Sequence, residues 1–332
     1  MRSGCLRYVR LAVTALFAVG LSMFPHTANA VCPTIQADLS TAITSAGAGG
    51  SIVLSCNTPT TLPFTAPITI SQSVTLDASS SPAAITFDGQ NMTQLFVVNS
   101  VSFTLKNVIL TQGLGADQGG AIHSNAGTVT IGNSTLTANA MTGSSNTGGG
   151  AISSLGGTLS IDGSTFSGNH ADKTGSFGSP GGGAIFIQGG TLTITNSTFS
   201  ANSTTNPIDT NSGGAIYNQG GTLSIVGSTF VNNLGNFGGA LWSQGPVTVS
   251  ESTFSGNGGN FAQGGAIYTT TTTNPTLTIV NSTFYQNLGN DSIEVQSAGV
   301  AQIGGSIIAN TSGGSGGATA NPNCAAFGRL QP

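Results

Sequence analysis

Short blocks of alternating apolar and polar residues recur along most of this chain. In the unit from Gly213 to Asn233, three such blocks lie at 215–218, 222–225 and 228–231, with glycines in the turns between them. Each block is shorter than six residues and is bounded by Gly or Asn, which is typical of short strands joined by turns. The pattern therefore predicts three β-strands per unit.

The unit is repeated six times. Each copy contains a Gly-Gly-Ala step, an alternating Thr-rich block, an apolar residue after Ser-Thr, and an Asn three positions later. The Gly-Gly-Ala steps start at Gly119, Gly149, Gly182, Gly213, Gly238 and Gly264; the apolar residues are Leu136, Phe166, Phe199, Phe230, Phe254 and Phe284; the asparagines are Asn139, Asn169, Asn202, Asn233, Asn257 and Asn287. Successive copies are 24 to 33 residues apart, a period that indicates a solenoid whose units bury their apolar sides against one another.

Three strands in the same order in every unit can pair only with the equivalent strands of the adjacent units. The sequence thus predicts an all-β, right-handed parallel β-helix of three-strand coils, about ten coils in all. Alternation places Leu, Ile and the Phe column inside and the Thr or Ser between them outside. The Asn is expected to hold the left-handed backbone of a corner and to stack its amides along the axis.

The chain divides into four segments on these patterns. Residues 1–30 are predicted to be a signal peptide, 31–58 an N-terminal cap, 59–310 the β-helix, and 311–332 an irregular C-terminal tail. Ile35, Leu39 and Ile43 recur every four residues, so the cap is expected to contain a short helix that ends at 47–50. Such a cap covers the strand edge that an open solenoid would expose.

The signal peptide is predicted from three features at the N-terminus. Arg2, Arg7 and Arg10 form a basic region, an apolar run follows at 11–24, and Ala28-Asn29-Ala30 fits a cleavage site after Ala30. The mature chain is expected to be secreted or on the cell surface, with no transmembrane segment and as a monomer.

The charge of the mature chain excludes some partners. Three basic residues remain against ten acidic ones, a net charge of −7. A chain with so few cations cannot neutralise phosphates, so nucleic-acid binding is excluded. Cys32 and Cys56 are predicted to form a disulfide in an exported protein, which leaves Cys324 without a partner in the chain.

The Gly-Gly-Ala-Ile and Phe-x-x-Asn pairing resembles the repeat of polymorphic outer-membrane proteins and related bacterial surface β-helices of pectin-lyase-like shape. The stretch Gly305–Asn310, followed by Pro322-Asn323-Cys324, resembles secreted choice-of-anchor β-helix proteins. These resemblances imply an extracellular or cell-surface location and adhesive roles.

Catalytic chemistry receives little support from the sequence. Glycoside hydrolysis needs carboxylates that face one groove, and lyases need a basic residue beside clustered carboxylates. The acidic residues considered fall singly on different coils or in turns: Asp77, Asp88, Asp162, Asp172, Asp209 and Glu251. His123 and His170 lack zinc-ligand spacing and are interpreted as surface residues. No catalytic residue, metal or cofactor is therefore predicted.

An aromatic column provides the candidate ligand-binding residues. Phe186, Tyr217, Trp242 and Tyr268 each follow an inward Ile or Leu, so alternation turns them away from the core. One interpretation is an exposed row of rings that stacks against a polysaccharide. The other is a covered hydrophobic cluster beneath the loops that leave the same corner at 140–148, 170–181 and 203–212.

The outward Thr and Ser of the second strand form another array. A flat Thr-x-Thr lattice is compatible with ice binding, but the strand propensity of Thr explains it equally well. Ser replaces Thr at several places, and Val247-Thr248-Val249 is read as a break in the pattern.

The sequence as a whole favours a non-catalytic exported β-helix module for adhesion or glycan binding. A divergent polysaccharide lyase or glycoside hydrolase of the same fold, and a purely structural spacer, remain as alternatives.

Overall fold

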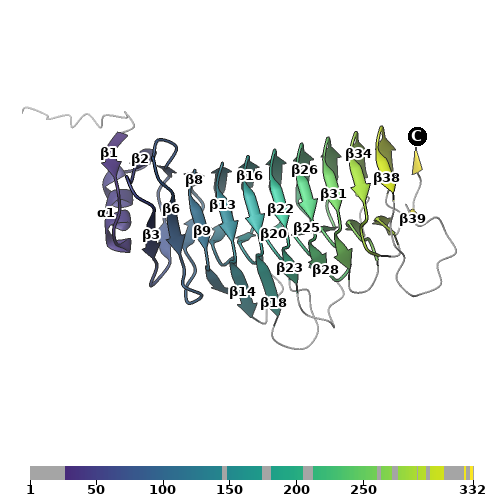
Figure 1. Cartoon of the computed structure of the whole chain (residues 1–332), viewed down its shortest axis with the longest axis horizontal. Coiled ribbons are helices and arrows are strands. Elements are labelled where there is room, and N and C mark those ends of the chain that lie inside the picture. Colours follow the sequence, from purple (N-terminus) through teal and green to yellow (C-terminus); the bar gives the residue numbers. More distant parts are fainter. Residues whose placement is uncertain are drawn as a thin grey trace, which may run out of the picture.

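The computed structural model describes residues 27–143, 148–173, 181–204, 212–259, 263–270, 276–289, 291–296, 300–309, 325–326 and 330–331. In this part the chain forms a rod of stacked coils, with one helix at the N-terminal end of the rod (Figure 1). The fold is the predicted right-handed parallel β-helix.

Three long parallel sheets run the length of the rod. Sheet A consists of β1 (Thr27–Val31), β2 (Gly50–Leu54), β5 (Val74–Asp77), β8 (Ser102–Lys106), β12 (Thr128–Gly132), β16 (Thr158–Asp162), β21 (Thr191–Thr195), β26 (Thr222–Val226), β30 (Val247–Ser250), β34 (Thr276–Val280), β37 (Val300–Gly304) and β40 (Leu330–Gln331). Sheet B consists of β3 (Thr60–Pro63), β6 (Ile85–Asp88), β9 (Ile109–Thr111), β13 (Thr135–Thr137), β17 (Thr165–Ser167), β22 (Thr198–Ser200), β27 (Thr229–Val231), β31 (Thr253–Ser255), β35 (Thr283–Tyr285) and β38 (Ile307–Ala309). Sheet C consists of β4 (Ile68–Ile70), β7 (Phe96–Asn99), β11 (Ile122–Asn125), β15 (Ile152–Ser154), β20 (Ile185–Gln188), β25 (Ile216–Gln219), β29 (Leu241–Ser243), β33 (Ile267–Thr269), β36 (Ile293–Val295) and β39 (Ala325–Ala326).

A fourth parallel sheet departs from the predicted three-strand coil. Sheet D contains β10 (Leu114–Ala116), β14 (Ala140–Gly143), β18 (His170–Lys173), β23 (Ser203–Thr204), β28 (Leu234–Gly235) and β32 (Gly258–Gly259). The short pair β19 (Gly181–Gly182) and β24 (Ser212–Gly213) lies between sheets D and C along the chain. One coil therefore runs from sheet C through A, B and D, and sheet D projects along one side of the rod (Figure 1).

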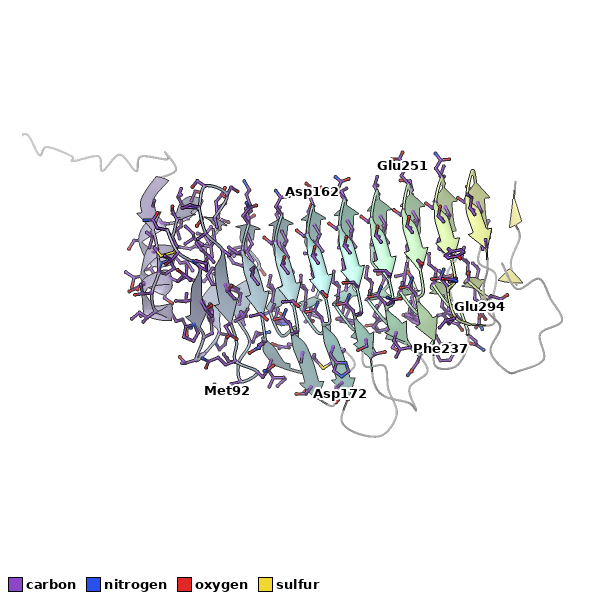
Figure 2. The ribbon with its side chains drawn as sticks, in the orientation of Figure 1. Met92, Asp162, Asp172, Phe237, Glu251 and Glu294 are labelled. Atoms are coloured by element: carbon purple, nitrogen blue, oxygen red, sulfur yellow. A yellow bond between two sulfur atoms is a disulfide. The ribbon has the colours of Figure 1, made fainter. Side chains whose placement is uncertain are left out.

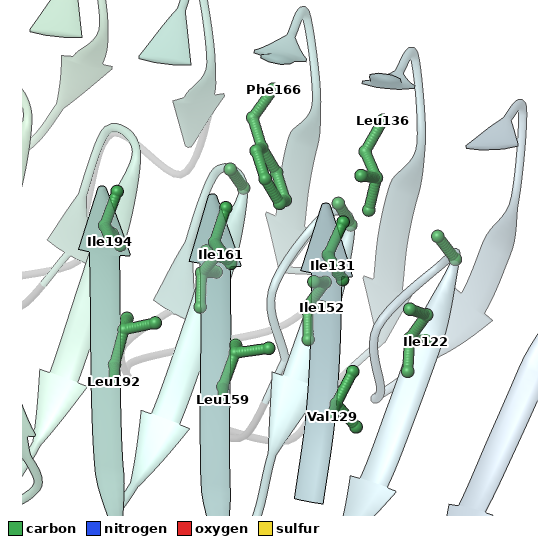
Figure 3. Packing of buried hydrophobic residues seen from close by; sticks show 14 of the residues in the cluster. Ile122, Val129, Ile131, Leu136, Ile152, Leu159, Ile161, Phe166, Leu192 and Ile194 are labelled. Carbon is green, nitrogen blue, oxygen red and sulfur yellow. The ribbon is translucent and has the colours of Figure 1, made fainter. Parts of the chain in front are cut away.

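The core is built from side chains stacked in register. Ile131 pairs with Ile161, and Ile161 with Ile194, so the same type of residue recurs at the same level of each coil (Figure 3). The Phe column of sheet B stacks its rings nearly parallel, with centroids 4.7–4.8 Å apart from Phe166 to Phe284. These rings are fully buried, as predicted.

The asparagine column forms the predicted ladder of amides. Asn202, for example, donates its Nδ2 to the carbonyl of Phe166 at 3.0 Å and to Oδ1 of Asn233 at 2.9 Å. The expectation that this Asn holds the left-handed backbone is wrong. Positive φ falls one residue earlier, at Ala138, Gly168, Ala201, Asn232, Gly256 and Gln286. The corner is thus made by the preceding residue, which frees the Asn side chain to point inward.

The N-terminal cap is the predicted helix. Helix α1 spans Gln36–Ala46, buries Leu39 and Ile43, and stops before Gly47, whose φ is 70°. Asp38 accepts hydrogen bonds from the backbone N–H groups of Thr34 and Ile35, which lower its carboxyl pKa. The structure contains the expected disulfide between Cys32 and Cys56, which ties the segment before the helix to the first turn after β2.

Two of the predicted segments, the signal peptide and the C-terminal tail, can be compared with the strands that the structure describes. Strand β1, which pairs with β2, includes the expected cleavage point after Ala30; cleavage there remains a prediction. The expected tail at 311–332 lies mostly outside the described residues, although β39 and β40 within it pair with β36 and β37. Cys324 lies outside the described residues. In the part of the chain that the structure describes, no helix is long and apolar enough to cross a membrane.

Candidate functional site

The aromatic column of sheet C forms a hydrophobic cluster separate from the core of the β-helix. Phe186 and Tyr217 have ring centroids 5.3 Å apart, and Tyr217 and Trp242 are 4.5 Å apart. Phe237, in the segment between β28 and β29, packs on Tyr268 at 5.1 Å. We call sheet D, the segments that join it to sheet C, and this cluster the side lobe.

The four rings face away from the core but are not exposed. Phe186 and Trp242 have no accessible surface, and Tyr217 and Tyr268 are 3% and 5% exposed. Of the two interpretations, the exposed row is therefore wrong and the covered cluster describes the structure. The physical reason is that the segments joining sheet D to sheet C run beside the rings: a Cβ on Gly182 or Gly213 would approach the backbone N of Tyr217 or Trp242 to 2.6–2.7 Å, and Phe237 packs against the cluster. Ligand binding by these four residues stays a prediction.

The Gly-Gly step allows the side lobe to lie close to the coils of the β-helix. A Cβ on Gly183 would approach Gly214 O and the backbone of Ser203 to less than 3.0 Å. The equivalent glycines Gly150, Gly214 and Gly239 meet backbone atoms of their neighbours in the same way. These positions need Gly because no side chain fits between sheet D and the next coil.

The row of outward side chains in sheet C continues beyond the aromatic rings. On the N-terminal side it passes through Ser153 to His123, which is 2% exposed, so its interpretation as a surface residue is wrong. Burial lowers the pKa of His123, and its Nδ1 has no hydrogen-bond partner among the described residues. His170 lies elsewhere, in sheet D, where its Nδ1 is 3.0 Å from Oγ of Ser203.

On the C-terminal side the row reaches a buried carboxyl group that the sequence analysis missed. Glu294 pairs with Tyr268 in the sheet, is 4% exposed, and accepts a hydrogen bond from Nε2 of Gln296 at 2.9 Å. Burial, and then the nearby Asp291, raise the pKa of Glu294. Burial also raises the pKa of Asp291, while burial and Glu294 raise that of Tyr268 to about 12. Aligning Ile293-Glu294 with Ile267-Tyr268 would have revealed this position.

The acidic residues that the sequence analysis considered are not brought together. Figure 2 shows Asp162 and Glu251 on one edge of the rod and Asp172 on the opposite edge. Asp77 pairs with Lys106 at 3.5 Å, and Asp162 accepts a hydrogen bond from Nδ2 of Asn196 at 3.1 Å. Asp209 lies outside the described residues. Within the described ranges no three His, Cys, Asp or Glu side chains are grouped to hold a metal ion.

The outer surface of the side lobe carries two exposed leucines. Leu234 pairs with Gly258, and Gly258 forms a bridge with Leu288, so the three positions follow one another across adjacent coils. Leu234 is 43% exposed and Leu288 51%. A Cβ on Gly258 would be in contact with both side chains, at 3.5–3.9 Å. The two leucines thus flank one glycine and form a small apolar patch, which we call the leucine patch.

Comparison with known families finds a match for two segments of the chain. Residues 163–188 and 196–219 match the family model described as the Chlamydia polymorphic membrane protein (Chlamydia_PMP) repeat. These two segments are similar to repeats of this type. Each match starts at a corner between sheets A and B, at Gly163 or Asn196, and ends with a strand of sheet C, so the repeat includes the side lobe.

The other comparisons add less. The search against curated proteins gave no match. Among solved structures, the chain is similar to the catalytic unit of the thermostable GH87 alpha-1,3-glucanase from Streptomyces thermodiastaticus strain HF3-3, with a TM-score of 0.41 and 13% identity over 88% of this chain and 67% of that one.

Proposed function

We propose that this chain is an exported, surface-associated adhesion module that binds cell-surface glycans through its side lobe. The matched repeat is named for membrane proteins of Chlamydia, which supports a location at a cell surface. The predicted signal peptide and the Cys32–Cys56 disulfide support export to an oxidising compartment.

The leucine patch carries the proposal. Leu234 and Leu288 stand on strands or bridges that pair with neighbouring coils, so their positions are fixed by the scaffold rather than by a free loop. Exposed apolar patches mark interaction sites when they lie on a rigid support. The side lobe offers the polar neighbours His170 and Ser203 along the same outer row of sheet D. An apolar contact with polar neighbours suits a sugar ring, which has apolar C–H faces and hydroxyls at its rim.

The aromatic cluster supports this surface from beneath. Trp242 and Tyr217 are buried and pack within the aromatic cluster of the side lobe, on the outer face of sheet C. We assign them the role of holding the lobe in place, so their replacement is expected to weaken binding indirectly.

A glycan-array screen with the purified mature chain tests the proposal. We expect the wild type to retain a subset of glycans and the double variant Leu234→Gln/Leu288→Gln to lose at least about tenfold in affinity. Ile307→Gln is the matched control, because Ile307 is also exposed, at 62%, but lies on sheet B. Equal affinity of the double variant and the wild type would show that the leucine patch is not the contact. A wild-type chain that retains no glycan would contradict glycan adhesion itself.

One observation favours a second candidate function, glycoside hydrolysis. Asp291 and Glu294 interact and burial raises both pKa values, and glycoside hydrolysis uses a pair of carboxyl groups of which one has a raised pKa. Release of reducing ends from insoluble and soluble glucans or from polygalacturonate, abolished by Glu294→Gln, would support this function. Absence of product from all of these substrates would exclude it for them.

A further inference from the structure

The outer face of sheet A carries a ladder of hydroxyl groups in strict register. One position per strand forms a column on eight successive strands, from β5 to β34: Thr75, Thr104, Thr130, Ser160, Thr193, Ser224, Thr248 and Thr278. A second column runs beside it two residues earlier along the strand: Ser102, Thr128, Thr158, Thr191 and Thr222. We call these two columns the threonine face.

The predicted break in the Thr column at Val247-Thr248-Val249 is not found in the structure. Val247 pairs with Leu223 and Val249 with Ile225, and both valines are buried in the core. Thr248 therefore points outward between Ser224 and Thr278 and continues the column. The apparent irregularity is an inward Val in place of Leu or Ile.

The threonine face is solvent-accessible and uncharged. Thr128, Thr158, Thr191 and Thr222 are exposed, and the members of the longer column are half-buried or exposed. Neither column contains a charged residue; the charged side chains of these strands, Asp77, Lys106 and Asp162, lie at strand ends. The two columns themselves offer no ion pair to a charged or phosphorylated partner, which favours a neutral partner.

The packing of the core sets the spacing between successive coils on the threonine face. The Phe column sets the coil repeat at 4.7–4.8 Å, and alternate residues along a strand are about 6.6–6.8 Å apart. In tetrahedrally bonded water, two hydrogen bonds of about 2.75 Å place next-nearest oxygens about 4.5 Å apart. The coil repeat is close to this value, so hydroxyl groups on successive coils can replace water molecules of an ordered lattice.

The chemistry of the threonine face favours ice over a polysaccharide as its ligand. The aromatic rings of the four-residue cluster, which could stack on sugars, are buried within the side lobe instead. Each Thr offers a hydroxyl and a methyl group, and many weak contacts to one periodic surface add up when the spacing is rigid. We propose that the threonine face of sheet A binds ice.

Growth of an ice hemisphere from a solution of the fluorescently labelled mature chain tests the proposal. We expect the wild type to be enriched in the ice by at least about tenfold over a labelled globular protein that does not bind ice. Thr193→Tyr, whose ring would stand out of the lattice, is expected to be excluded. Thr198→Tyr is the matched control, because it makes the same change five residues later, on the half-buried outer face of sheet B in the same coil. Thr222→Lys, at an exposed position, is a second variant for the case that Thr193→Tyr does not fold, and circular dichroism checks each variant.

Three results would overturn the proposal. The first is exclusion of the wild type from ice. The second is incorporation of folded Thr193→Tyr and Thr222→Lys at the wild-type level. The third is loss of incorporation by Thr198→Tyr alone, which would place the binding face on sheet B. Retention of the wild type on crystalline cellulose or chitin, with exclusion from ice, would identify a polysaccharide as the partner instead.

Discussion

Asn233 shows how much one polar side chain contributes inside the β-helix. Its Nδ2 donates to the carbonyl of Phe199 and to Oδ1 of Asn257, each at 2.9 Å. Its Oδ1 accepts from the backbone N–H and the Nδ2 of Asn202, at 3.0 and 2.9 Å. The side chain is 1% exposed, so water cannot replace these bonds. The same arrangement repeats along the corner and connects each coil to both of its neighbours.

We therefore predict that Asn233→Ala lowers the free energy of unfolding by about 2–4 kcal/mol, because it leaves buried backbone groups of Phe199 and Asn202 without partners. Asn232→Ala is the matched control: Asn232 is exposed and has a φ of 54°, and Ala already occupies this position at Ala138 and Ala201. Asn232→Ala should lower the free energy of unfolding by about 1 kcal/mol or less. Urea unfolding measures both, and equal losses would argue against the ladder.

Glu294 makes the stability of the folded chain depend on pH, in a direction that follows from its raised pKa. Its pKa is raised in the folded chain, so below the unfolded value the carboxyl group is neutral in both states. As the pH rises, the unfolded state loses the proton first, and the stability of the terminal coils falls until the folded pKa is passed.

Glu294→Gln should therefore stabilise the chain at pH 7 and have little effect near pH 4. Thermal unfolding at both pH values measures the difference, with the exposed Glu251→Gln as control. A variant that is less stable than the wild type at pH 7 would contradict the prediction.

At the scale of elements, the sequence predicted the strands and side-chain columns that recur in every coil. It missed the burial of side chains that depends on which segment covers a sheet from outside. The strands of sheets A and B, the Phe column and helix α1 follow from alternation and spacing, because each position recurs with the same environment. The burial of Phe186 and Trp242 does not follow, since alternation says only that a side chain leaves the core. What covers it depends on sheet D, whose two- to four-residue strands carry no alternating signal of their own. Glu294 differs, because aligning Ile293-Glu294 with Ile267-Tyr268 places it in the same column and the sequence analysis did not extend the column that far.

The packing between sheet D and sheet C predicts an unusual sensitivity to a single methyl group. Gly183→Ala should destabilise the chain by about 3 kcal/mol or prevent its accumulation as soluble protein, because the Cβ would overlap backbone atoms. Gly304→Ala is expected to change stability by less than about 0.5 kcal/mol, since nothing lies within 4 Å of its Cβ position and its φ is not positive. Chemical unfolding of both variants is the measurement, and a tolerated Gly183→Ala would show that the side lobe can move away.

At the scale of the whole molecule, each described coil pairs only with the coil before it and the coil after it. Stability in such a chain is a sum of coil and interface terms, so the ends open first. Helix α1 and the Cys32–Cys56 disulfide close the N-terminal end.

Replacing both cysteines with Ser should lower stability by about 3–4 kcal/mol, as expected for a disulfide that spans 24 residues. Hydrogen exchange should show the loss mainly in α1 and β2, with little change in the middle coils. A uniform loss of protection along the rod would contradict coil-by-coil opening.

The register between equivalent strands has an evolutionary consequence. Because Leu192 faces Leu223 and Phe199 faces Phe230, unequal recombination between two copies of the coding repeat can delete or duplicate a complete turn without shifting any ladder. The resulting proteins would differ in length while keeping every surface in phase. Lengthening by gene conversion or slippage would then change the number of contacts that the molecule makes with a long target, and selection could adjust avidity without altering a single binding residue.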